Sequence, residues 1–492
     1  MGEKIKLGLT RNRLFEFDNC VCFVGAFKEC LDVGECEKAL KMLFLKEPIL
    51  SCKAELSGDG DAFLITESVA PFLETITHSD LEAFVEQRKR HGLDFNEKLF
   101  SFSLVNGNVL VVFAHTLVAD VRSLCYLAGE FKSFLQKENL NILPSEICVL
   151  SESSELPSNV FSVVIDRVAS GLEVGWQKKI KAFSFEDYTT ARERYFNKKS
   201  PVKSISCTVD EALLEKIKSF AEKNCVDVSS VVAYSFYENL MKNTSGKRKY
   251  RKLNVFADER VFLQNGQKLK VGAFNGVVSV VLKKKKKETL ETQQDKVCAF
   301  HKGIYKKITT AFSVFYNEVL LMRLSGSFCD SQYMCLSGAF NHKYSKKLAY
   351  TYGCANEVMG EFCSLNLSQK YWQKLQGFEN VCFTEPLKCR SSSMITFIQK
   401  SCTGEIVFEY KTEKISENTA ENIKSQSLEE NIAKQETSDR EVITENKLSE
   451  PEDAKKEAAV NMVMNMLGNS KSKGSAADEL QEMMRSLSQK NK

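Results

Sequence analysis

The first 140 residues contain apolar segments with two different periods. A wholly apolar run from Val109 to Ala114 leads directly into His115, which predicts a buried strand. The pair Asn106-Gly107 separates this run from another apolar run at 102–105, and Asn-Gly between apolar runs indicates a tight β-hairpin. A helix is predicted next, because apolar residues recur at helical spacing at Leu124, Leu127, Phe131 and Phe134.

Similar patterns continue on both sides of this segment. Strands are predicted at 20–27, 49–56, 62–67, 253–257, 277–282, 394–399 and 405–410. Helices are predicted at 33–45, 209–223 and 228–242. The last of these helices is apolar on most faces, so we expect it to be buried. The mixture of strands and helices indicates an α/β (α+β) protein.

A chain of 492 residues is long for one hydrophobic core, so more than one domain is expected. Residues 1–140 form the predicted first half and residues 201–424 the predicted second half. Residues 141–200 are rich in Ser, Glu and Lys and have weak periodicity, which favours a crossover linker with some local helix at 188–196.

The composition changes after Tyr410, which is the last aromatic residue. Residues 425–492 are therefore predicted to be a flexible, low-complexity tail, because so few apolar side chains cannot offset the entropy of ordering. Two short amphipathic helices are expected in it, on the pattern Val460, Val463, Met464, Leu467 and the pattern Leu480, Met483, Met484, Leu487. These helices either dock on a partner protein or on the body, or stay solvated.

Charge and cysteine content exclude some classes of site. The formal net charge of +4 gives no argument for nucleic acid as a partner. Lysine-rich clusters at 247–252 and 283–287 are consistent with a phosphate-binding patch, an import signal or simply solvated loops. The 17 cysteines contain no CxxC pair, so we expect free thiols and no metal site. Without a long apolar run or a secretory leader, a cytoplasmic protein with no membrane span is expected.

The richest chemistry lies where the strand ends at His115. A strand that delivers a histidine into a loop, with Asp120 to brace the backbone, is a common way to place a general base in a cleft. The segment resembles the HHxxxDG loop of the superfamily of condensation domains and CoA-dependent acyltransferases, most closely its alcohol acetyltransferase-like members. Here Thr116 stands at the second histidine of that motif, and Val121 at its glycine.

The resemblance extends along about residues 10–424, through several shorter motifs in the family's order. Leu31-Asp32 opens a helix that ends before Glu47-Pro48, and Gly92-Leu93-Asp94-Phe95 precedes the hairpin. In the second half, Arg260 and the segment Gly272-Ala273-Phe274 are similar to the family's arginine and GxFxN segment, with Asn275 one residue early.

The resemblance implies a fold of two chloramphenicol-acetyltransferase-like halves, a pseudodimer around a central cleft with His115 and Asp120 on a loop at its floor. It also implies acyl transfer from a thioester donor, acyl-CoA or a carrier protein, to a small hydroxyl or amine acceptor. No bound cofactor is implied, and a CoA thioester is the implied co-substrate. The implied residues are His115 as the supporting histidine, Thr116 at the base position, Asp120 as the structural carboxylate paired with Arg260, and Ser123, Gly272, Phe274 and Asn275 along the cleft.

The threonine has a direct chemical consequence. A hydroxyl cannot serve as a base near neutral pH, and general-base assistance contributes about 10²–10⁴ in rate. His115 would substitute only if the loop turned, because neighbouring residues at a strand end face opposite sides. The sequence therefore leaves open an acyltransferase with an impaired or lost base, or a catalytically inactive binding or scaffold protein.

Overall fold

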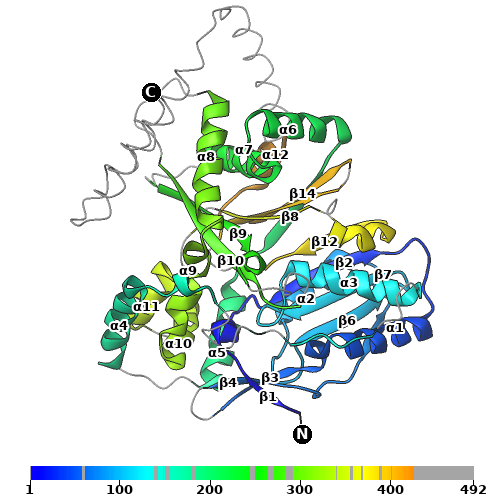
Figure 1. The fold of residues 1–492 in the computed structure, drawn as a ribbon, viewed down its shortest axis with the longest axis horizontal. Helices are drawn as coiled ribbons and strands as arrows, with labels where there is room; N and C mark the ends of the chain where they lie inside the picture. Colours follow the sequence, from blue (N-terminus) through cyan, green and yellow to red (C-terminus); the bar gives the residue numbers. More distant parts are fainter. Residues whose placement is uncertain are drawn as a thin grey trace, which may run out of the picture. The chain divides into compact units, whose positions relative to one another are not determined.

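The computed structural model describes residues 2–425, apart from 58–60, 138–141, 148, 150–155, 179–183, 244–249, 264–270, 284–291, 339–340, 355–357, 359, 367–369, 387–390 and 401 (Figure 1). These residues belong to one compact unit that extends to Ala433. The predicted tail helices lie outside the described residues, as do most of the lysine clusters at 247–252 and 283–287.

The first half is built on a sheet that has five strands in the described part of the chain. Their spatial order is β12 (Asn380–Thr384), β2 (Cys20–Ala26), β7 (Val109–His115), β6 (Phe100–Val105) and β5 (Leu73–Ile76). Helices α1 (Val33–Lys46) and α3 (Val121–Leu135) pack on one face, and α2 (Leu81–His91) packs on the other. Successive side chains of β7 point to opposite faces of the sheet, so the strand contributes apolar side chains to both. Leu110 and Val112 join the main core, while Val111 and Phe113 pack with α2.

The predicted hairpin is confirmed. Strands β6 and β7 are antiparallel, with Val105 opposite Val109. Three residues, 106–108, connect the strands, and the first two, Asn106 and Gly107, have positive φ, +53° and +77°, a conformation that Asn and Gly adopt most easily. The hairpin sets the register that carries His115 to the end of β7.

The second half is built on a mixed sheet in which six strands are described. Their spatial order is β10 (Asn275–Lys283), β9 (Tyr250–Asp258), β11 (Gly360–Asn366), β13 (Ser393–Gln399), β14 (Gly404–Lys411) and β8 (Val202–Val209). Helices α6 (Glu211–Lys223), α8 (Gln293–Ile308) and α12 (Glu417–Ser425) surround α7 (Val228–Asn243), which contacts β11 and β13. Residues 230–240 of α7 are all buried, as its apolar composition predicted.

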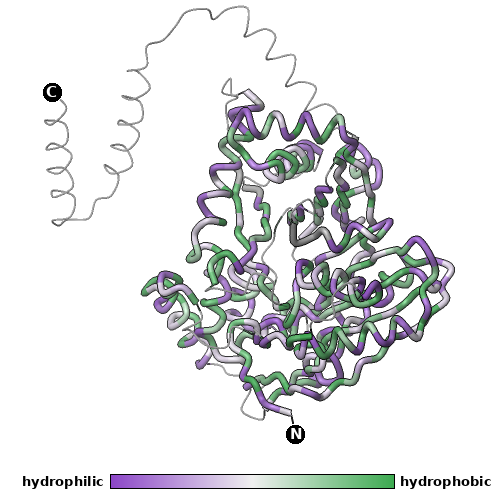
Figure 2. The backbone as a smooth tube through the Cα atoms, turned by 45° about the vertical axis from the view of Figure 1, so that its right-hand side comes forward, coloured by the Kyte–Doolittle hydropathy of each residue, from purple (hydrophilic) through white to green (hydrophobic). Residues whose placement is uncertain are grey.

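The remaining elements complete the same unit. A small sheet joins β1 (Lys4–Lys6), β4 (Ala62–Ile65) and β3 (Lys53–Leu56). A helical group contains α4 (Val163–Gln177), α5 (Phe185–Lys198), α9 (Ala311–Met322), α10 (Gly326–Ser337) and α11 (Lys343–Thr351). The short 3-10 helices are η1 (Leu9–Arg13), η2 (Pro48–Ser51), η4 (Ser158–Val160), η5 (Glu259–Phe262) and η7 (Lys370–Gly377). Hydrophobic and hydrophilic residues alternate along many of these helices (Figure 2), as expected where one face is buried.

Some sequence expectations need correction. The strand predicted at 49–56 is shorter, because Pro48 begins the 3-10 turn η2 and the strand starts only at Lys53. The helix predicted from 209 begins at Glu211, since Val209 still belongs to β8 and Asp210 caps the helix. The linker region contains α5, which covers the predicted local helix at 188–196, and also α4, which the pattern did not predict.

One strand from the second half of the sequence joins the sheet of the first half. β12 comes from the second half of the sequence but pairs antiparallel with β2, with Phe383 opposite Phe23. The predicted domain boundaries at 140, 200 and 424 stay predictions. β12 falls within the predicted second half of the sequence but lies in the sheet of the first half. Among the helices that are described, none is long and apolar enough to cross a lipid bilayer.

Candidate active site

The loop between β7 and α3 begins at His115 and ends at Asp120, the N-cap of α3. The Asp120 carboxylate accepts a hydrogen bond from the backbone N–H of Ser123 at 2.8 Å. The helix predicted from Leu124 to Phe134 therefore starts at Val121, directly after the loop. The cap of α3 and the end of β7 fix the two ends of this loop. Within the loop, Thr116 is 6% exposed and Asp120 is 2% exposed.

Asp120 and Arg260 form the predicted ion pair. The Arg260 guanidinium donates to both carboxylate oxygens, at 2.7 and 3.0 Å, and the N–H of Phe274 adds a third bond at 3.2 Å. Burial alone would raise the pKa of Asp120, but the charge and hydrogen bonds of Arg260 outweigh it and lower the pKa. Arg260 also lies over the Phe274 ring, 4.5 Å from its centroid. The pair joins the loop of the first half to the second half.

Ser123 and Gly272 extend this junction. The Ser123 hydroxyl lies 2.9 Å from Asp120 Oδ1 and 2.8 Å from the carbonyl oxygen of Gly272, and it accepts from Arg260 at 2.9 Å. A Cβ atom at Gly272 would lie 2.2 Å from the Phe274 ring, so the close approach of backbone and ring requires glycine. The structure thus brings together five predicted residues on one buried contact.

Asn275 lies at the start of β10, beside this contact. Its side-chain amide donates to Glu385 at 2.6 Å, and its side-chain oxygen accepts from Arg122 at 3.1 Å. Glu385, just beyond β12, also accepts from the backbone N–H of Val121 at 3.1 Å. A carboxylate at this place is favourable because the N-terminus of α3 carries partial positive charge.

His115 is fully buried, and it does not line either of the two cavities described below, so its predicted place on the floor of a cleft stays a prediction. As the last residue of β7 it falls on the face that carries Val111 and Phe113. Its Nδ1 accepts the backbone N–H of Leu117 at 3.1 Å, so the neutral ring carries its proton on Nε2. Burial, with a smaller effect of the Arg192 guanidinium, lowers the pKa of His115 to about 3. Neither ring nitrogen is therefore available as a base.

Thr116 is held by three contacts from the segment that precedes β2. Its hydroxyl donates to Glu16 Oε2 at 3.1 Å, and its backbone N–H donates to the Asn19 carbonyl at 2.7 Å. Its own carbonyl oxygen accepts from Arg13 at 3.4 Å. The side chain at the motif's base position thus points to a carboxylate from residues 9–19, a segment in which no motif was recognised.

Arg13 is the centre of a buried charge cluster. It pairs with Glu318, which is also hydrogen-bonded to Glu259. Burial and the Glu318 carboxylate raise the pKa of Glu259 well above its usual range. Burial alone would lower the pKa of Arg13, but Glu318, Glu259 and Glu16 raise it, so the guanidinium stays charged.

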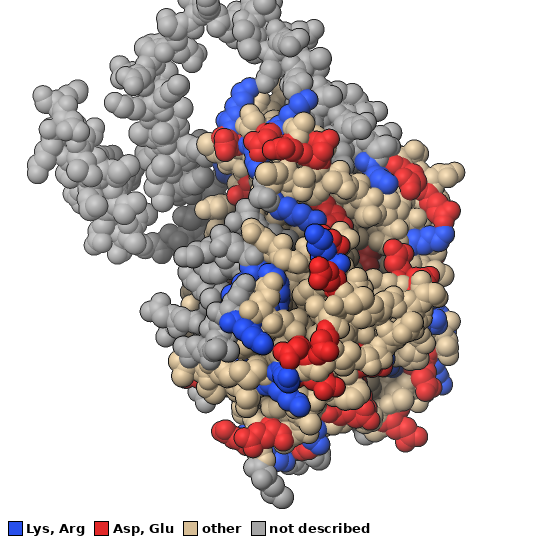
Figure 3. All heavy atoms as spheres, turned by 90° about the vertical axis from the view of Figure 1, so that its right-hand side faces the viewer, with Lys and Arg blue, Asp and Glu red and all other residues tan. Residues whose placement is uncertain are grey.

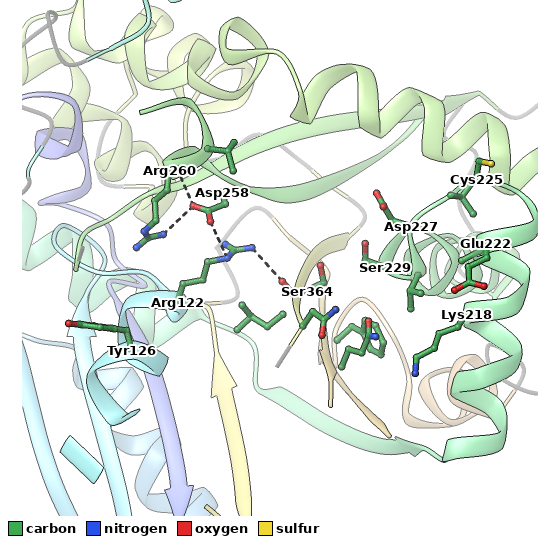
Figure 4. Close-up of a pocket in the computed structure, with 18 of the residues that line it drawn as sticks. Arg122, Tyr126, Lys218, Glu222, Cys225, Asp227, Ser229, Asp258, Arg260 and Ser364 are labelled. Carbon is green, nitrogen blue, oxygen red and sulfur yellow. Dashed lines mark hydrogen bonds and ion pairs between the residues drawn. The ribbon is translucent and has the colours of Figure 1, made fainter. Parts of the chain in front are cut away.

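A first cavity, of ≈ 750 Å³, lies on the Ser123 side of the loop (Figure 4). Arg122 extends from α3 toward Asp258 and the Ser364 carbonyl, while Lys218 of α6 lies across the cavity. The cavity is also lined by the first residues of α7, whose N-terminal N–H groups favour negative charge. Its charged lining is balanced, with basic residues Arg122, Lys218 and Arg260 and acidic residues Glu222, Asp227 and Asp258.

A second cavity, of ≈ 90 Å³, lies on the Thr116 side. Arg13, Glu16, Asn275 and Glu318 are among its lining residues, and the first two of these bond to Thr116. The side-chain oxygen of Asn12, which also lines it, is buried and has no hydrogen-bond donor among the described residues. Arg122 lines the first cavity and bonds to Asn275, which lines the second. Residues next to the His115–Asp120 loop therefore line both cavities, Arg122 and Ser123 the large one and Glu16, which bonds to Thr116, the small one.

The sequence did not point to Arg13, Glu16, Arg122 or Glu385. Arg122 directly follows the last residue of the motif, Val121, and its position there was a usable signal. The other three belong to segments without any motif, and only the fold brings them to the loop.

On the face shown in Figure 3, basic and acidic side chains are interspersed and do not gather in one patch. Within the described ranges, no group of three or more His, Cys, Asp or Glu side chains is arranged to hold a metal ion. Every cysteine that the structure describes is a free thiol.

Comparison with known proteins identifies the fold. No protein-family model matches the sequence. No curated protein matches it either. Among solved structures, the epimerization domain from the third module of tyrocidine synthetase B matches with a TM-score of 0.57 at 13% identity, covering 88% of this chain and 97% of that chain.

Further solved structures agree. The condensation domain of Monacolin K polyketide synthase matches with a TM-score of 0.57 at 10% identity, covering 88% of this chain and 97% of that chain. The trichothecene 15-O-acetyltransferase from Fusarium sporotrichioides matches with a TM-score of 0.56 at 11% identity, covering 87% and 94%. The protein therefore has the fold of condensation domains and of this acetyltransferase, an acyltransferase-like fold. The predicted pseudodimer architecture is confirmed.

Proposed function

We propose that this protein transfers an acyl group from a thioester donor, with CoA as the donor, to a small hydroxyl or amine acceptor. The observation that carries the proposal is that the residues around the Asp120–Arg260 pair line two cavities of unequal size. Ser123 and Arg260 line the large cavity, and Glu16, which bonds to Thr116, lines the small one. The fold, shared with condensation domains and an acetyltransferase, supports the same reaction class.

The first cavity is the candidate donor site. Its volume of ≈ 750 Å³ lies within the usual range for a cofactor-sized ligand. Arg122, Lys218 and the N-terminus of α7 offer contacts to the phosphates of CoA. Since acidic residues balance these cations, we expect modest affinity for CoA. The second cavity is the candidate acceptor site, and His115 serves the loop as a structural residue.

The donor assignment is tested by equilibrium binding. Isothermal titration of CoA into the wild type should give a measurable affinity, which Lys218→Ala and Arg122→Ala weaken several-fold because each removes a cation from the cavity wall. Lys38→Ala, which removes an exposed lysine on α1, should not change the affinity. Comparing acetyl-CoA with S-acetylpantetheine separates the contribution of the nucleotide phosphates from that of the thioester arm.

The transfer reaction is tested by release of free CoA from acetyl-CoA in the presence of an acceptor. Transfer should be slow in the wild type, and Thr116→His should raise it, because an imidazole at this position titrates near neutral pH. Absence of transfer in both proteins, together with absence of CoA binding, would instead support the inactive scaffold interpretation.

A further inference from the structure

A third cavity, of ≈ 860 Å³, is lined by elements from both halves of the body. The first half contributes α2 and residues of β2 and β12, and the second half contributes β8, β14 and α12. Its described lining includes Val109 of β7, which lies at the opposite end of this strand from His115, and no residue of the motif loop. Six residues of extended strand span about 20 Å, so this cavity is separate from that loop.

Two buried polar side chains in the lining lack hydrogen-bond partners. Glu409 on β14 is 4% exposed, and its Oε2 has no partner among the described residues. Thr384, the last residue of β12, is 9% exposed, and its Oγ1 has no partner within the same part of the chain. Leaving buried polar atoms unpaired is costly, so both oxygens indicate a bound group that donates hydrogen bonds.

The charge of Glu409 is only partly compensated. Its Oε1 accepts a hydrogen bond from Lys89 at 3.3 Å, but the same ammonium group also donates to Glu86 at 3.1 Å. Two carboxylates therefore share one lysine, and the three side chains together carry one net negative charge. A cation bound at the free Oε2 would balance this charge.

The cations of an adjoining cavity are bonded elsewhere. Glu409 also lines this cavity, of ≈ 690 Å³, together with Arg90 and Lys199. Lys199 pairs with Asp18, and Arg90 donates to the carbonyl oxygen of Phe196. Neither contact neutralises the Glu409 carboxylate.

Further carboxylates line the third cavity from two helices. Glu82 and Glu86 are four residues apart on α2, and Glu417 and Glu421 are four residues apart on α12. Like charges at this spacing repel each other and destabilise a helix. The lining as a whole contains five carboxylates and two lysines, one of which, Lys203, pairs with Glu417. The excess of negative charge therefore favours a ligand with more than one positive charge.

Much of the remaining lining is aliphatic. It is formed mainly by small branched side chains and one alanine, which are Val24, Ala26, Val85, Val109, Val202 and Val407. Such a surface binds methylene groups through the hydrophobic effect, and it offers no ligands to a hydrated metal ion. The volume of the cavity lies in the usual range for a small organic molecule.

We propose that the third cavity is a binding site for a linear aliphatic diamine or polyamine. One ammonium group donates to Glu409 Oε2 and Thr384 Oγ1, since an ammonium has three N–H donors and both oxygens can accept. The methylene chain lies against the valine side chains, and a second ammonium group lies near the carboxylates of α2 and α12. This site goes beyond the proposed acyl transfer and does not depend on it.

Isothermal titration of spermidine into the full chain tests the site. Spermidine and cadaverine, a five-carbon diamine, should both bind measurably, and spermidine should bind more tightly because it carries one more charge. Pentanediol, which has hydroxyl groups in place of the two amines of cadaverine, should not bind measurably. Raising the salt concentration should weaken spermidine binding only in part, because salt screens the exposed carboxylates more than the buried Glu409.

Variants of the lining locate the bound molecule. Glu409→Gln should weaken spermidine binding by about 10–100-fold, because a hydrogen bond to a charged group is lost. Thr384→Val keeps the shape of the side chain and should weaken binding by about 2–10-fold. Ala26→Leu should also weaken binding, because it fills part of the cavity and changes no charge. Glu35→Gln, which alters an exposed glutamate on α1, is the matched control and should leave the affinity unchanged.

Several results would overturn the inference. Spermidine binding that survives Glu409→Gln, Thr384→Val and Ala26→Leu but disappears at high salt would show surface attraction only. Equal binding of pentanediol would remove the role of charge, and tighter binding of trilysine than of spermidine would indicate a basic peptide instead. Absence of binding to the wild type would remove the site altogether. Circular dichroism establishes that each variant is folded, and if Glu409→Gln is not, the other two lining variants carry the test.

Discussion

At the scale of single residues, the surroundings of a side chain decide which chemistry it can perform. His115 has the right residue type for a base but is buried with its Nδ1 already bonded. Asp120 has the right type for proton transfer but is committed to Arg260. Glu16 is only partly buried and lies at a cavity. The chemistry of the loop therefore follows from contacts rather than from residue type.

The Asp120–Arg260 pair should be essential for stability. Asp120→Asn removes the bidentate partner of the buried Arg260 charge, although Asp258 stays 3.3 Å away, and we expect it to lower the free energy of unfolding by about 3–5 kcal/mol. Urea denaturation measures this. The double variant Asp120→Asn/Arg260→Met should lose less than the two single variants added together, because no charge is left unpaired. Additive losses would show that the pair is not coupled.

His115 should make stability depend on pH. The pKa of His115 in the folded protein, about 3, lies below the ordinary value of about 6.5, so only the unfolded chain takes up the proton between these values. The resulting stability is complete above pH 6.5 and is lost as the pH falls toward 3. Between pH 7.5 and 5 the wild type should lose about 2 kcal/mol more than His115→Asn. If urea denaturation showed the wild type and His115→Asn losing the same free energy of unfolding between these pH values, a buried neutral imidazole would be contradicted.

At the scale of elements, the hairpin and the helices place the site residues. The β6–β7 hairpin sets the register of β7 and hence the position of His115, while the cap at Asp120 starts α3. β12 supplies the strand that precedes Glu385 and joins the second half to the first sheet. Each element fixes one end of a segment that carries a site residue.

Glycine substitutions test these elements with opposite expected signs. Gly107→Ala forces alanine to a φ of +77° in the hairpin and should lower the free energy of unfolding by about 1–2 kcal/mol. Gly171→Ala lies within α4, where a Cβ atom would meet nothing within 4 Å, and should raise it by about 0.5–1 kcal/mol. Thermal and urea unfolding of both variants provide the check, and a stabilising Gly107→Ala would refute the turn geometry.

At the scale of the whole molecule, the body closes with α12. Ile415, Ala420 and Ile423 are buried at 2%, 0% and 0% exposure, and α12 packs against α7. The compact unit ends at Ala433. The last element that the structure describes, α12, is therefore part of the folded body.

Truncation should reveal this limit. A chain that ends at Ala433 should unfold at the same midpoint as the full chain, because the body keeps all of α12. A chain that ends at Lys411 exposes the α7 surface that α12 covers, and we expect a loss of about 4 kcal/mol or more. A large destabilisation of the chain that ends at Ala433 would indicate that the tail helices dock on the body.

The sequence by itself determined the local elements. Periodicity located most of the strands and helices near the site, and Asn106-Gly107 defined the hairpin, because such patterns depend on neighbours close in the chain. The order of motifs also led to the pair of Asp120 and Arg260, which are 140 residues apart. It named Ser123 and Gly272 as cleft residues, but their mutual hydrogen bond came only from the structure. These predictions held because they rest on a family's arrangement or on local geometry.

Only the tertiary structure decided how the loop works. It buried His115 and turned its Nδ1 to Leu117, and it brought Glu16 to Thr116 from 100 residues away. It also placed β12 in the first sheet, which put Glu385 beside Asn275. No local pattern records such contacts, because burial and long-range pairing depend on how separate segments pack and not on the residues next to them in the chain.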